Sequence, residues 1–290
     1  EAVTEFINLA YPKLNVIFIK IDKFQGEGSG LGYTLSKSKK FLQSPFYFIS
    51  CDTLIKNSIP EYNYNWVGFS KKDNFKEYRT LNLDNQRVVG INEKNISSKS
   101  NNAYIGLAFI KDYEIFWESL KENNNEFIEQ GEVCGLKNLI SKNLLSLEFD
   151  WYDTGTPNEL KRSKEAFRKD NSINILEKEN EDIWFVNDII IKYSSDKDFI
   201  LNRVQRSNIL ENYVPKILNK SSNMYSYKKV KGEVLSKVLN TKNFEKLLLF
   251  SRKFWLKKNL DNEEKKVFKK LCFNFYNLKT LRRINDLFLK

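Results

Sequence analysis

Histidine is absent from the 290 residues, so the most common general base and every nucleophile–histidine pair are excluded. Any catalysis must therefore use carboxylates, lysines and bound metal. Cysteine is scarce as well. Cys51, Cys134 and Cys272 stand far apart without paired spacing, which argues against a disulfide framework and a zinc site. We expect the three cysteines to be ordinary core residues.

Long hydrophobic runs are also missing, since the longest apolar stretches are far shorter than the roughly 20 residues of a membrane span. No signal-peptide pattern opens the chain. These absences predict a cytoplasmic protein without a membrane partner. The basic, amphipathic segment 267–290 could lie on an anionic membrane, but packing within its own domain is the favoured reading.

The charge is strongly positive: 48 Lys and Arg against 37 Asp and Glu give a formal +11. Such a balance permits nucleic acid, an anionic membrane or phosphorylated small molecules as partners. No zinc-finger, RNP-like or basic-zipper pattern accompanies the charge, so we do not expect a nucleic-acid partner.

Helical and strand-like patterns alternate in the first part of the chain. Residues 1–11 have helical spacing, and 15–21 is a β-branched run of strand length. A glycine-rich loop and a helix follow, and then 46–55, a nearly continuous apolar run with the profile of a buried parallel strand. This order predicts an α/β fold, a Rossmann-like sheet with flanking helices, over residues 1–170.

The character changes near residue 171, where a polar stretch precedes two strands joined at 186–188. A helix-like segment, 196–210, follows, and then a predicted strand pair at 223–230 and 230–235. The remaining sequence is mostly helical. We predict a second, smaller α+β domain over 171–290.

Two acidic residues each follow a strand-like segment, Asp52 after an apolar run and Asp153 in the stretch FDWYDTGTPNEL. They are 153 − 52 = 101 residues apart, but the carboxyl ends of parallel strands meet in one crevice. Two convergent carboxylates suit Mg²⁺, which completes its shell with water and phosphate oxygens. The structural alternative is that Asp52 starts a turn and Asp153 caps the next helix.

The loop QGEGSGLGY, residues 25–33, follows the strand predicted at 15–21 and precedes a predicted helix. Its backbone could approach a nucleotide closely, and Gln25 could hydrogen-bond a base edge. The loop matches neither the dinucleotide-binding nor the P-loop pattern, so those two functions are not expected.

These motifs, together with NEK at 92–94 and AYIGLAFI at 103–110, resemble in their order over residues 1–168 the sugar-phosphate nucleotidyltransferase family. The stretch around Asp153, Trp-x-Asp-Thr-Gly-Thr, is the most specific of them. The resemblance implies nucleobase contacts for Gln25 and Gly30, Mg²⁺ binding by Asp52 and Asp153, substrate contacts for Glu93 and Lys94, and a pocket-lining role for Gly106.

The sequence departs from this family in one respect. The family opens with a glycine-rich loop that binds the triphosphate, and the given sequence contains no match to that loop. Because the chain opens as if in mid-helix at Glu1, we expect that it is truncated there. The family's reaction needs no histidine, since a phosphorylated acceptor is already an anionic nucleophile. Expected partners are an NTP and a phosphorylated sugar or small alcohol, in surface polysaccharide or capsule synthesis. A homo-oligomer is a further expectation.

The second part of the chain resembles the N-terminal lobe of aminoglycoside and choline phosphotransferases. By that resemblance Lys192 would bind the phosphates of ATP, and 227–230 would form the hinge. The catalytic and metal-binding loops of those kinases have no match, so a truncated lobe and a purely structural appendage both remain open. For the whole chain, the alternatives to an enzyme are a non-catalytic nucleotide-binding scaffold and a basic nucleic-acid binder.

Overall fold

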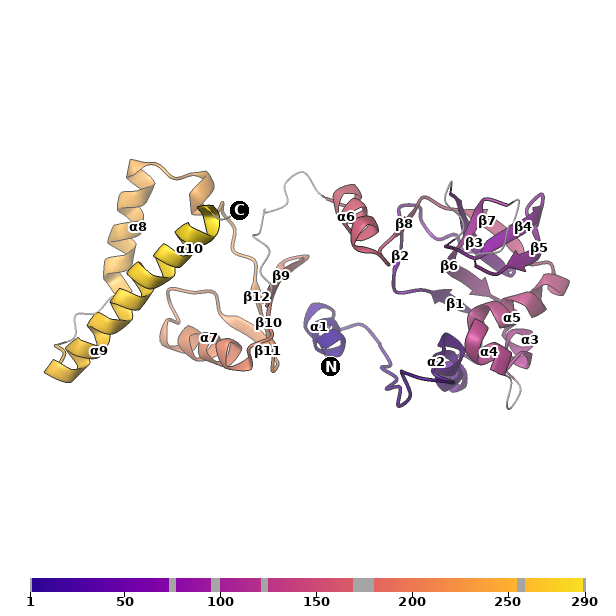
Figure 1. The fold of residues 1–290 in the computed structure, drawn as a ribbon, viewed down its shortest axis with the longest axis horizontal. Helices are drawn as coiled ribbons and strands as arrows, with labels where there is room; N and C mark the ends of the chain where they lie inside the picture. The colour runs from indigo at the N-terminus through magenta and orange to yellow at the C-terminus, as the bar shows by residue number, and fades with distance from the viewer. Residues whose placement is uncertain are drawn as a thin grey trace. The chain divides into compact units, whose positions relative to one another are not determined.

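The computed structural model describes residues 2–72, 77–94, 100–120, 125–168, 180–254 and 259–288. These residues form two compact units (Figure 1). One unit comprises residues 15–168; the other combines residues 2–14 with 180–288. The predicted boundary at 170/171 lies outside the described residues, and the N-terminal helix belongs to the second unit instead of the first.

The unit of residues 15–168 is built from eight described strands and five short α-helices. Its helices are α2 (Leu31–Ser38), α3 (Tyr113–Glu118), α4 (Asn125–Gln130), α5 (Glu132–Leu139) and α6 (Pro157–Ala166). Its strands are β1 (Phe46–Ile49), β2 (Thr53–Ile55), β3 (Trp66–Lys71), β4 (Thr80–Asp84), β5 (Arg87–Asn92), β6 (Asn102–Ile110), β7 (Leu145–Glu148) and β8 (Trp151–Asp153).

Six strands form one sheet in the order β1-β6-β3-β7-β5-β4, and β2 pairs with β8. The expectation of a parallel, Rossmann-like sheet needs correction, because the sheet is mixed: β3 and β7 are parallel, and the other pairs are antiparallel. A tight connection explains one of the antiparallel pairs. Asn85, with a φ of 54°, closes the β4–β5 hairpin, and so short a turn can join only antiparallel strands.

Residues 15–21 form an extended loop instead of the predicted strand. Ile17 and Phe18 are exposed there. A β-branched run becomes a strand only when a neighbour supplies ladder hydrogen bonds, and among the described strands none pairs with this segment. The strand-like segment before Asp153 is also interrupted, because residues 149–150 separate β7 from β8.

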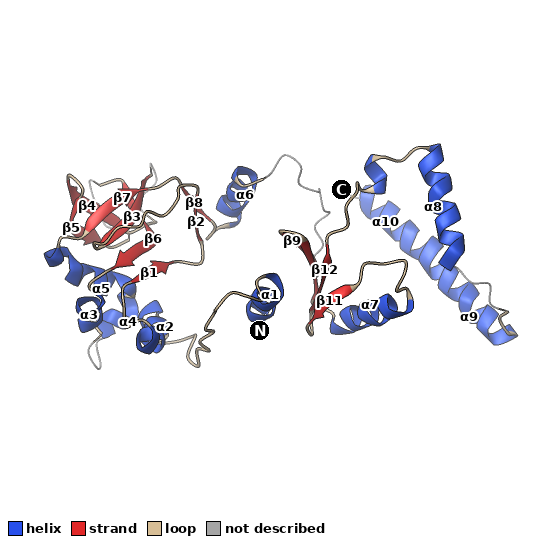
Figure 2. Cartoon of the chain, turned by 180° about the vertical axis from the view of Figure 1, so that it is seen from behind, coloured by secondary structure: helices blue, strands red, loops and turns tan. Residues whose placement is uncertain are grey.

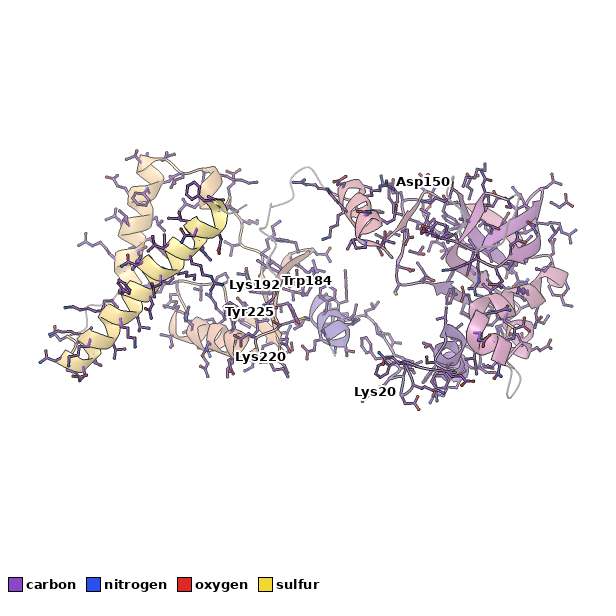
Figure 3. The ribbon with its side chains drawn as sticks, viewed as in Figure 1. Lys20, Asp150, Trp184, Lys192, Lys220 and Tyr225 are labelled. Atoms are coloured by element: carbon purple, nitrogen blue, oxygen red, sulfur yellow. The ribbon has the colours of Figure 1, made fainter. Side chains whose placement is uncertain are left out.

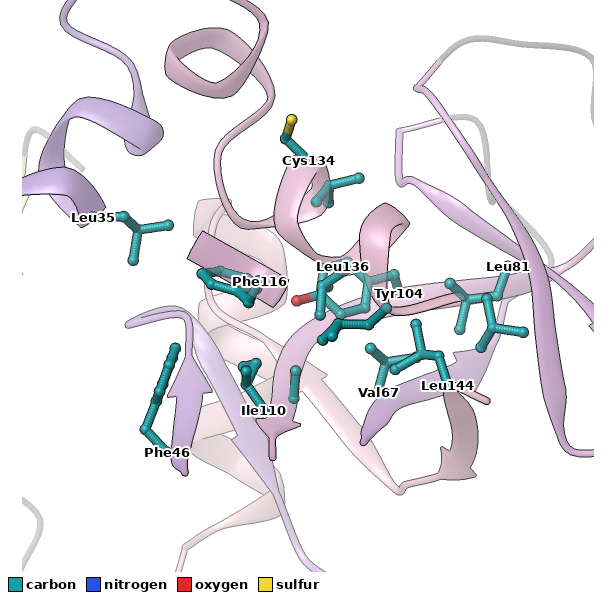
Figure 4. Close-up of a cluster of buried hydrophobic side chains, with 14 of the residues drawn as sticks. Leu35, Phe46, Val67, Leu81, Tyr104, Ile110, Phe116, Cys134, Leu136 and Leu144 are labelled. Carbon is teal, nitrogen blue, oxygen red and sulfur yellow. The ribbon is translucent and has the colours of Figure 1, made fainter. Parts of the chain in front are cut away.

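Strand β6 is buried on both faces and organises the core. Tyr104, Ala108 and Ile110 point into the cluster under the helices (Figure 4), and Ile105 and Leu107 point into a second cluster. This alternation follows from the two-residue period of a strand. The position of β6 therefore explains why its sequence is a nearly unbroken apolar run.

The second unit contains a four-stranded sheet (Figure 2). Its strands pair in the order β11-β12-β10-β9. Its elements are α1 (Ala2–Ala10), β9 (Glu181–Val186), β10 (Ile189–Ser194), α7 (Lys197–Ile209), β11 (Ile217–Lys220), β12 (Met224–Lys228), α8 (Thr241–Phe254), α9 (Asn262–Phe273) and α10 (Lys279–Phe288). The predicted β9–β10 hairpin is confirmed. The predicted strand at 230–235 is wrong, since β12 pairs with β11.

Helices cover both faces of this sheet. On one face α1 packs against β10 and β12, where Leu9 meets Ile191 and Met224, and the Phe6 ring lies edge-on to Trp184 at 5.0 Å. On the other face α7 packs against Tyr225. The N-terminal helix therefore completes the core of the C-terminal unit.

Helices α8 to α10 carry many exposed apolar side chains, among them Phe268, Leu271 and Leu281. The expected packing of segment 267–290 on its own unit is thus absent in the described part of the chain. No described helix is both long and apolar enough to cross a membrane. Of the cysteines, Cys134 is buried and Cys51 is exposed, so the core role predicted for all three holds only in part.

Candidate active site

Asp52 and Asp153 lie together at one end of the β2–β8 ribbon. Thr53 is the register partner of Asp153, which places Asp52 beside the residues that follow β8. The backbone N–H and the hydroxyl of Thr154 both donate to the Asp52 carbonyl, each at 3.1 Å. Backbone pairing therefore brings the two acids together, as the motifs predict, although the strands involved are antiparallel.

A small space separates the two carboxylates at Gly155. A Cβ atom built on Gly155 would lie 3.2 Å from Asp153 Oδ1 and 3.8 Å from Asp52 Oδ2. Glycine thus leaves open a cradle that both carboxylates face. The Gly155 N–H donates to Asp153 Oδ1 at 2.8 Å and holds that carboxylate in place.

The capping alternative for Asp153 is wrong. Thr156 is the N-cap of α6, and its hydroxyl accepts from the Glu159 N–H at 3.2 Å. The Asp153 side chain instead accepts from the Tyr78 hydroxyl at 2.9 Å and is buried. Burial, and then this hydrogen bond, raise the pKa of Tyr78 well above its ordinary value, so the phenol stays a donor.

The acids open onto a cavity of about 430 Å³, a size that suits a small organic ligand. Four predicted residues line it: Asp52, Lys94, Gly106 and Asp153. Among the described residues, the acidic and basic side chains of its lining are four carboxylates and two cations, namely Asp52, Glu77, Glu132, Asp153, Arg79 and Lys94. Because carboxylates outnumber cations, a polyphosphate would need a divalent cation to bind there.

The chemistry of the lining fits Mg²⁺ but not a metal site made of protein alone. Throughout the described ranges no group of three or more Cys, Asp or Glu side chains could hold a metal ion. Mg²⁺ needs fewer, since it is commonly bound by one or two carboxylates together with water and phosphate oxygens. The cradle between Asp52 and Asp153 meets that lower requirement.

Gly106 shapes the wall of the cavity. Its φ of +68° lies in the left-handed region that favours glycine, and a Cβ atom there would collide with the Ser50 side chain. The Ser50 N–H donates to the Gly106 carbonyl at 2.8 Å. This close approach ties β6 to the turn that carries Asp52.

Glu93 supports the cavity from outside, because it is not part of the lining. Its carboxylate pairs with Arg79 Nε at 2.8 Å and with Lys137 Nζ at 3.2 Å. Burial alone would raise the pKa of Glu93, but the hydrogen bonds from Arg79 and Lys137 outweigh it and lower the pKa. Glu93 thus fixes Arg79 in the wall, whereas Lys94, its neighbour, reaches the cavity itself.

The structure adds Arg79, Tyr104 and Glu132 to the predicted residues. Glu132 is 4% exposed and Tyr104 is 7% exposed, and both line the cavity. Within the described residues, Glu132 Oε2 and the Tyr104 hydroxyl make no well-formed hydrogen bond. Burial raises the pKa of both groups. Glu132 and Tyr104 act on each other electrostatically. Poorly satisfied buried polar atoms are costly, so a ligand that gives each of them a well-aligned hydrogen bond would be favoured.

Gln25 and Gly30 do not line this cavity, although Leu31, which follows Gly30, does. Gln25 is exposed in the loop before α2, and Gly30 is the N-cap of that helix. A Cβ atom on Gly30 would collide with the carbonyl of Ile128 in α4. The structure thus shows a packing reason for Gly30, and the nucleobase contacts of both residues stay predictions.

Lys192 lies in the other unit, on β10 opposite Tyr225 of β12 (Figure 3). Its Nζ atom is 5.7 Å from the centre of the Tyr227 ring. Both line a cavity of about 210 Å³, to which α7 contributes Arg203 and Arg206. Asp196, an early carboxylate of the helix segment, caps α7 by accepting from the Phe199 N–H at 3.0 Å.

No protein-family model and no curated protein matches the sequence. Among solved structures, one similar structure is assigned as a glucose-1-phosphate thymidylyltransferase from Bacillus anthracis in complex with sucrose. It is 18% identical in sequence with a TM-score of 0.48, and the match covers 60% of this chain and 74% of that chain. The CTP:phosphocholine cytidylyltransferase from Streptococcus pneumoniae is 15% identical in sequence, with a TM-score of 0.48. The match covers 57% of this chain and 75% of that chain.

A UDP-glucose pyrophosphorylase complexed with UDP-glucose is 19% identical, with a TM-score of 0.40, and it covers 49% of this chain and 63% of that one. These three structures are therefore of sugar-phosphate and phosphocholine nucleotidyltransferases. Their TM-scores are all below 0.5, so the likeness assigns no residue roles to this chain.

Proposed function

We propose that residues 15–168 carry the acceptor and metal site of a nucleotidyltransferase, which joins an NTP to a phosphorylated sugar or small alcohol. The observation that carries the proposal is the convergence of Asp52 and Asp153 on the cradle at Gly155, inside a cavity that also presents Arg79 and Lys94. The Trp-x-Asp-Thr-Gly-Thr motif supports the same activity.

In this reaction a phosphate oxygen of the acceptor attacks the α-phosphorus of the NTP. One P–O bond forms, the bond from the α-phosphorus to the bridging oxygen breaks, and pyrophosphate leaves with that bonding pair. The attacking oxygen is already anionic, so no general base is required. A reaction without a general base is compatible with the absence of histidine from the chain.

Asp52 and Asp153 would hold Mg²⁺, which supplies charge neutralisation for the polyphosphate. Tyr78 and the Gly155 N–H keep the Asp153 carboxylate oriented. Arg79 and Lys94 would bind the acceptor phosphate, and Glu93 would position Arg79. Glu132 and Tyr104 would offer an acceptor and a donor to hydroxyl or amino groups of the same substrate.

The test incubates the chain with each NTP, Mg²⁺ and a panel of sugar phosphates and amino-alcohol phosphates, and measures pyrophosphate release. At least one pair should release pyrophosphate in the presence of Mg²⁺ and none after chelation. If no pair reacts, and Asp52→Asn leaves Mg²⁺-dependent NTP binding unchanged, the proposal is wrong. If Asp52→Asn abolishes binding without any turnover in the wild type, the non-catalytic nucleotide-binding alternative is favoured.

Four narrower expectations stay predictions: ATP binding at Lys192, a role in surface polysaccharide synthesis, the cytoplasmic location and a homo-oligomeric state. A pyrophosphate assay addresses none of these.

A further inference from the structure

The cavity in the second unit has the opposite electrostatic character to the candidate active site. The described part of its lining includes three cationic side chains, Lys192, Arg203 and Arg206, and neither Asp nor Glu. Glu181 lies outside that lining, although its charge acts on Tyr225. A site of this composition attracts anions directly and does not need a divalent cation to bridge them.

The two arginines reach the cavity because of helical spacing. Positions 203 and 206 are three residues apart, so they share one face of α7, and Ser207 and Leu210 continue that face. The adjacent face of α7, with Ile200 and Val204, packs against Tyr225 and Tyr227 on β12, and both tyrosines also line the cavity. Burial raises the pKa of both tyrosines, so their hydroxyls remain protonated and do not repel an anion.

The rest of the lining is apolar: Leu210, Val214, Pro215 and Ile217, with the two tyrosine rings stacked at 6.2 Å. The cavity, at about 210 Å³, is smaller than the roughly 300–1,000 Å³ of pockets that enclose a drug-sized ligand. It therefore suits a single phosphate group with a small apolar substituent better than a complete nucleotide.

We propose that this cavity is a metal-independent binding site for a phosphate monoester, held by Arg203, Arg206 and Lys192 with its organic group against Leu210 and the tyrosines. The site lies outside residues 15–168 and does not depend on the nucleotidyl transfer proposed for them. It also differs from the ATP site implied by the kinase resemblance, which requires a metal and a larger ligand.

The experiment measures binding of phenyl phosphate and inorganic phosphate to the full chain by calorimetry in excess EDTA. Chelation separates the two cavities, since the carboxylate-rich one needs a divalent cation. Phenyl phosphate should bind more tightly than inorganic phosphate. Binding should also weaken between pH 7.5 and pH 5, because the second pKa of a phosphate monoester is about 6 and the dianion is the favoured form.

The variants Arg203→Gln and Arg206→Gln should each weaken phenyl phosphate binding by about tenfold or more, the effect of losing a charge-assisted hydrogen bond. The matched control is Lys197→Gln, which removes the same charge from an exposed position of α7 outside the cavity. Asp52→Asn is the control for the other unit. Both controls should change the affinity by less than about twofold.

Three results would overturn the proposal: no binding by the wild type in EDTA, equal loss of binding in Lys197→Gln, or binding that appears only with Mg²⁺ and ATP. The variant Arg206→Lys controls for misfolding, because it keeps the positive charge and replaces the planar guanidinium group with an ammonium group. It should bind with intermediate affinity if the site is as described.

Discussion

Thr154 donates two hydrogen bonds to the carbonyl oxygen of Asp52, one from its backbone N–H and one from its hydroxyl, across a separation of 102 residues. Asp153 precedes Thr154 directly, so these two hydrogen bonds hold the backbones of the two candidate metal ligands, Asp52 and Asp153, beside each other. The carboxylate pair is thus positioned by backbone geometry, and its side chains stay available to a ligand.

The hydrogen bonds from Thr154 to Asp52 give the first prediction. Thr154→Val removes one hydrogen bond while preserving shape, so we expect a loss of about 1 kcal/mol in the free energy of unfolding, and weaker Mg²⁺-dependent NTP binding. Thr154→Ser keeps the hydroxyl and is the control. Urea titration and NTP binding would measure both effects; equal behaviour of the two variants would show that the hydroxyl is unimportant.

The second prediction concerns the charge of Asp153. Asp153→Asn should lower pyrophosphate release by about 100-fold, the scale observed when one preorganised electrostatic contact is removed. It should leave the fold intact, since Asn can still accept from the Gly155 N–H. Asp150→Asn changes an exposed acid nearby and should retain activity. Comparable losses in both variants would contradict a specific role for Asp153.

The third prediction concerns Gly106. Gly106→Ala should lower the free energy of unfolding by about 1–3 kcal/mol, because its φ of +68° and the Ser50 side chain both oppose a Cβ atom. Gly90→Ala is the comparison, since the nearest atom there is 3.2 Å away on the side chain of Asn82. Chemical denaturation of the two variants would show whether the larger cost falls at Gly106.

The fourth prediction is a pH dependence from Glu132. Its pKa is raised in the folded state, so below the unfolded pKa the carboxyl is protonated in both states and its ionisation does not reduce stability. The cost of ionisation grows as the pH rises from the unfolded to the folded pKa, and stability falls accordingly. Glu132→Gln should therefore raise Tm by about 2–4 °C near pH 7.5, the shift that about 1 kcal/mol produces in a domain of this size.

At pH 4 the same substitution should have little effect on Tm, because the carboxyl is then protonated in both states. Thermal melts of wild type and variant at the two pH values would decide. A destabilisation that is largest at pH 7.5 would mean that the ionised carboxylate is favourable where it lies, contrary to the burial argument.

The fifth prediction concerns the pairing of Arg79 with Glu93. The two side chains are 20% and 35% exposed, so a double-mutant cycle with Arg79→Met and Glu93→Gln should give a coupling of about 0.5–1 kcal/mol. The exposed pair Lys71–Glu148, at 3.3 Å, should give a smaller value. Because the pKa of Glu93 is lowered, the coupling should be present above pH 4.5 and decline as the pH falls.

Sequence reasoning located the parts of the site that a motif records. Asp52 and Asp153 converge, and Lys94 and Gly106 line the same cavity. Those residues belong to short stretches in which the spacing itself constrains the backbone. The β9–β10 hairpin was predictable for the same reason, since Asn187, with a φ of 53°, is a turn residue between two apolar runs.

Sequence reasoning missed Arg79 and Glu132, because nothing in their local pattern separates them from the many other charged residues of the chain. Their importance comes from strand and helix packing that brings them to one wall. The strand predicted at 15–21 failed for a related reason: its β-branched composition was evident, but propensity cannot supply the neighbouring strand.

The docking of α1 on the sheet of the second unit makes residues 15–168 an insertion within that unit. The chain passes between the two units twice, so a single backbone cut near residue 14 or within 169–179 leaves a covalent path through the other connection. A fragment that starts at residue 180 would lose the helix that covers Trp184 and Ile191. Separate study of the C-terminal unit therefore calls for a circular permutant, in which residues 2–14 rejoin it through a new linker.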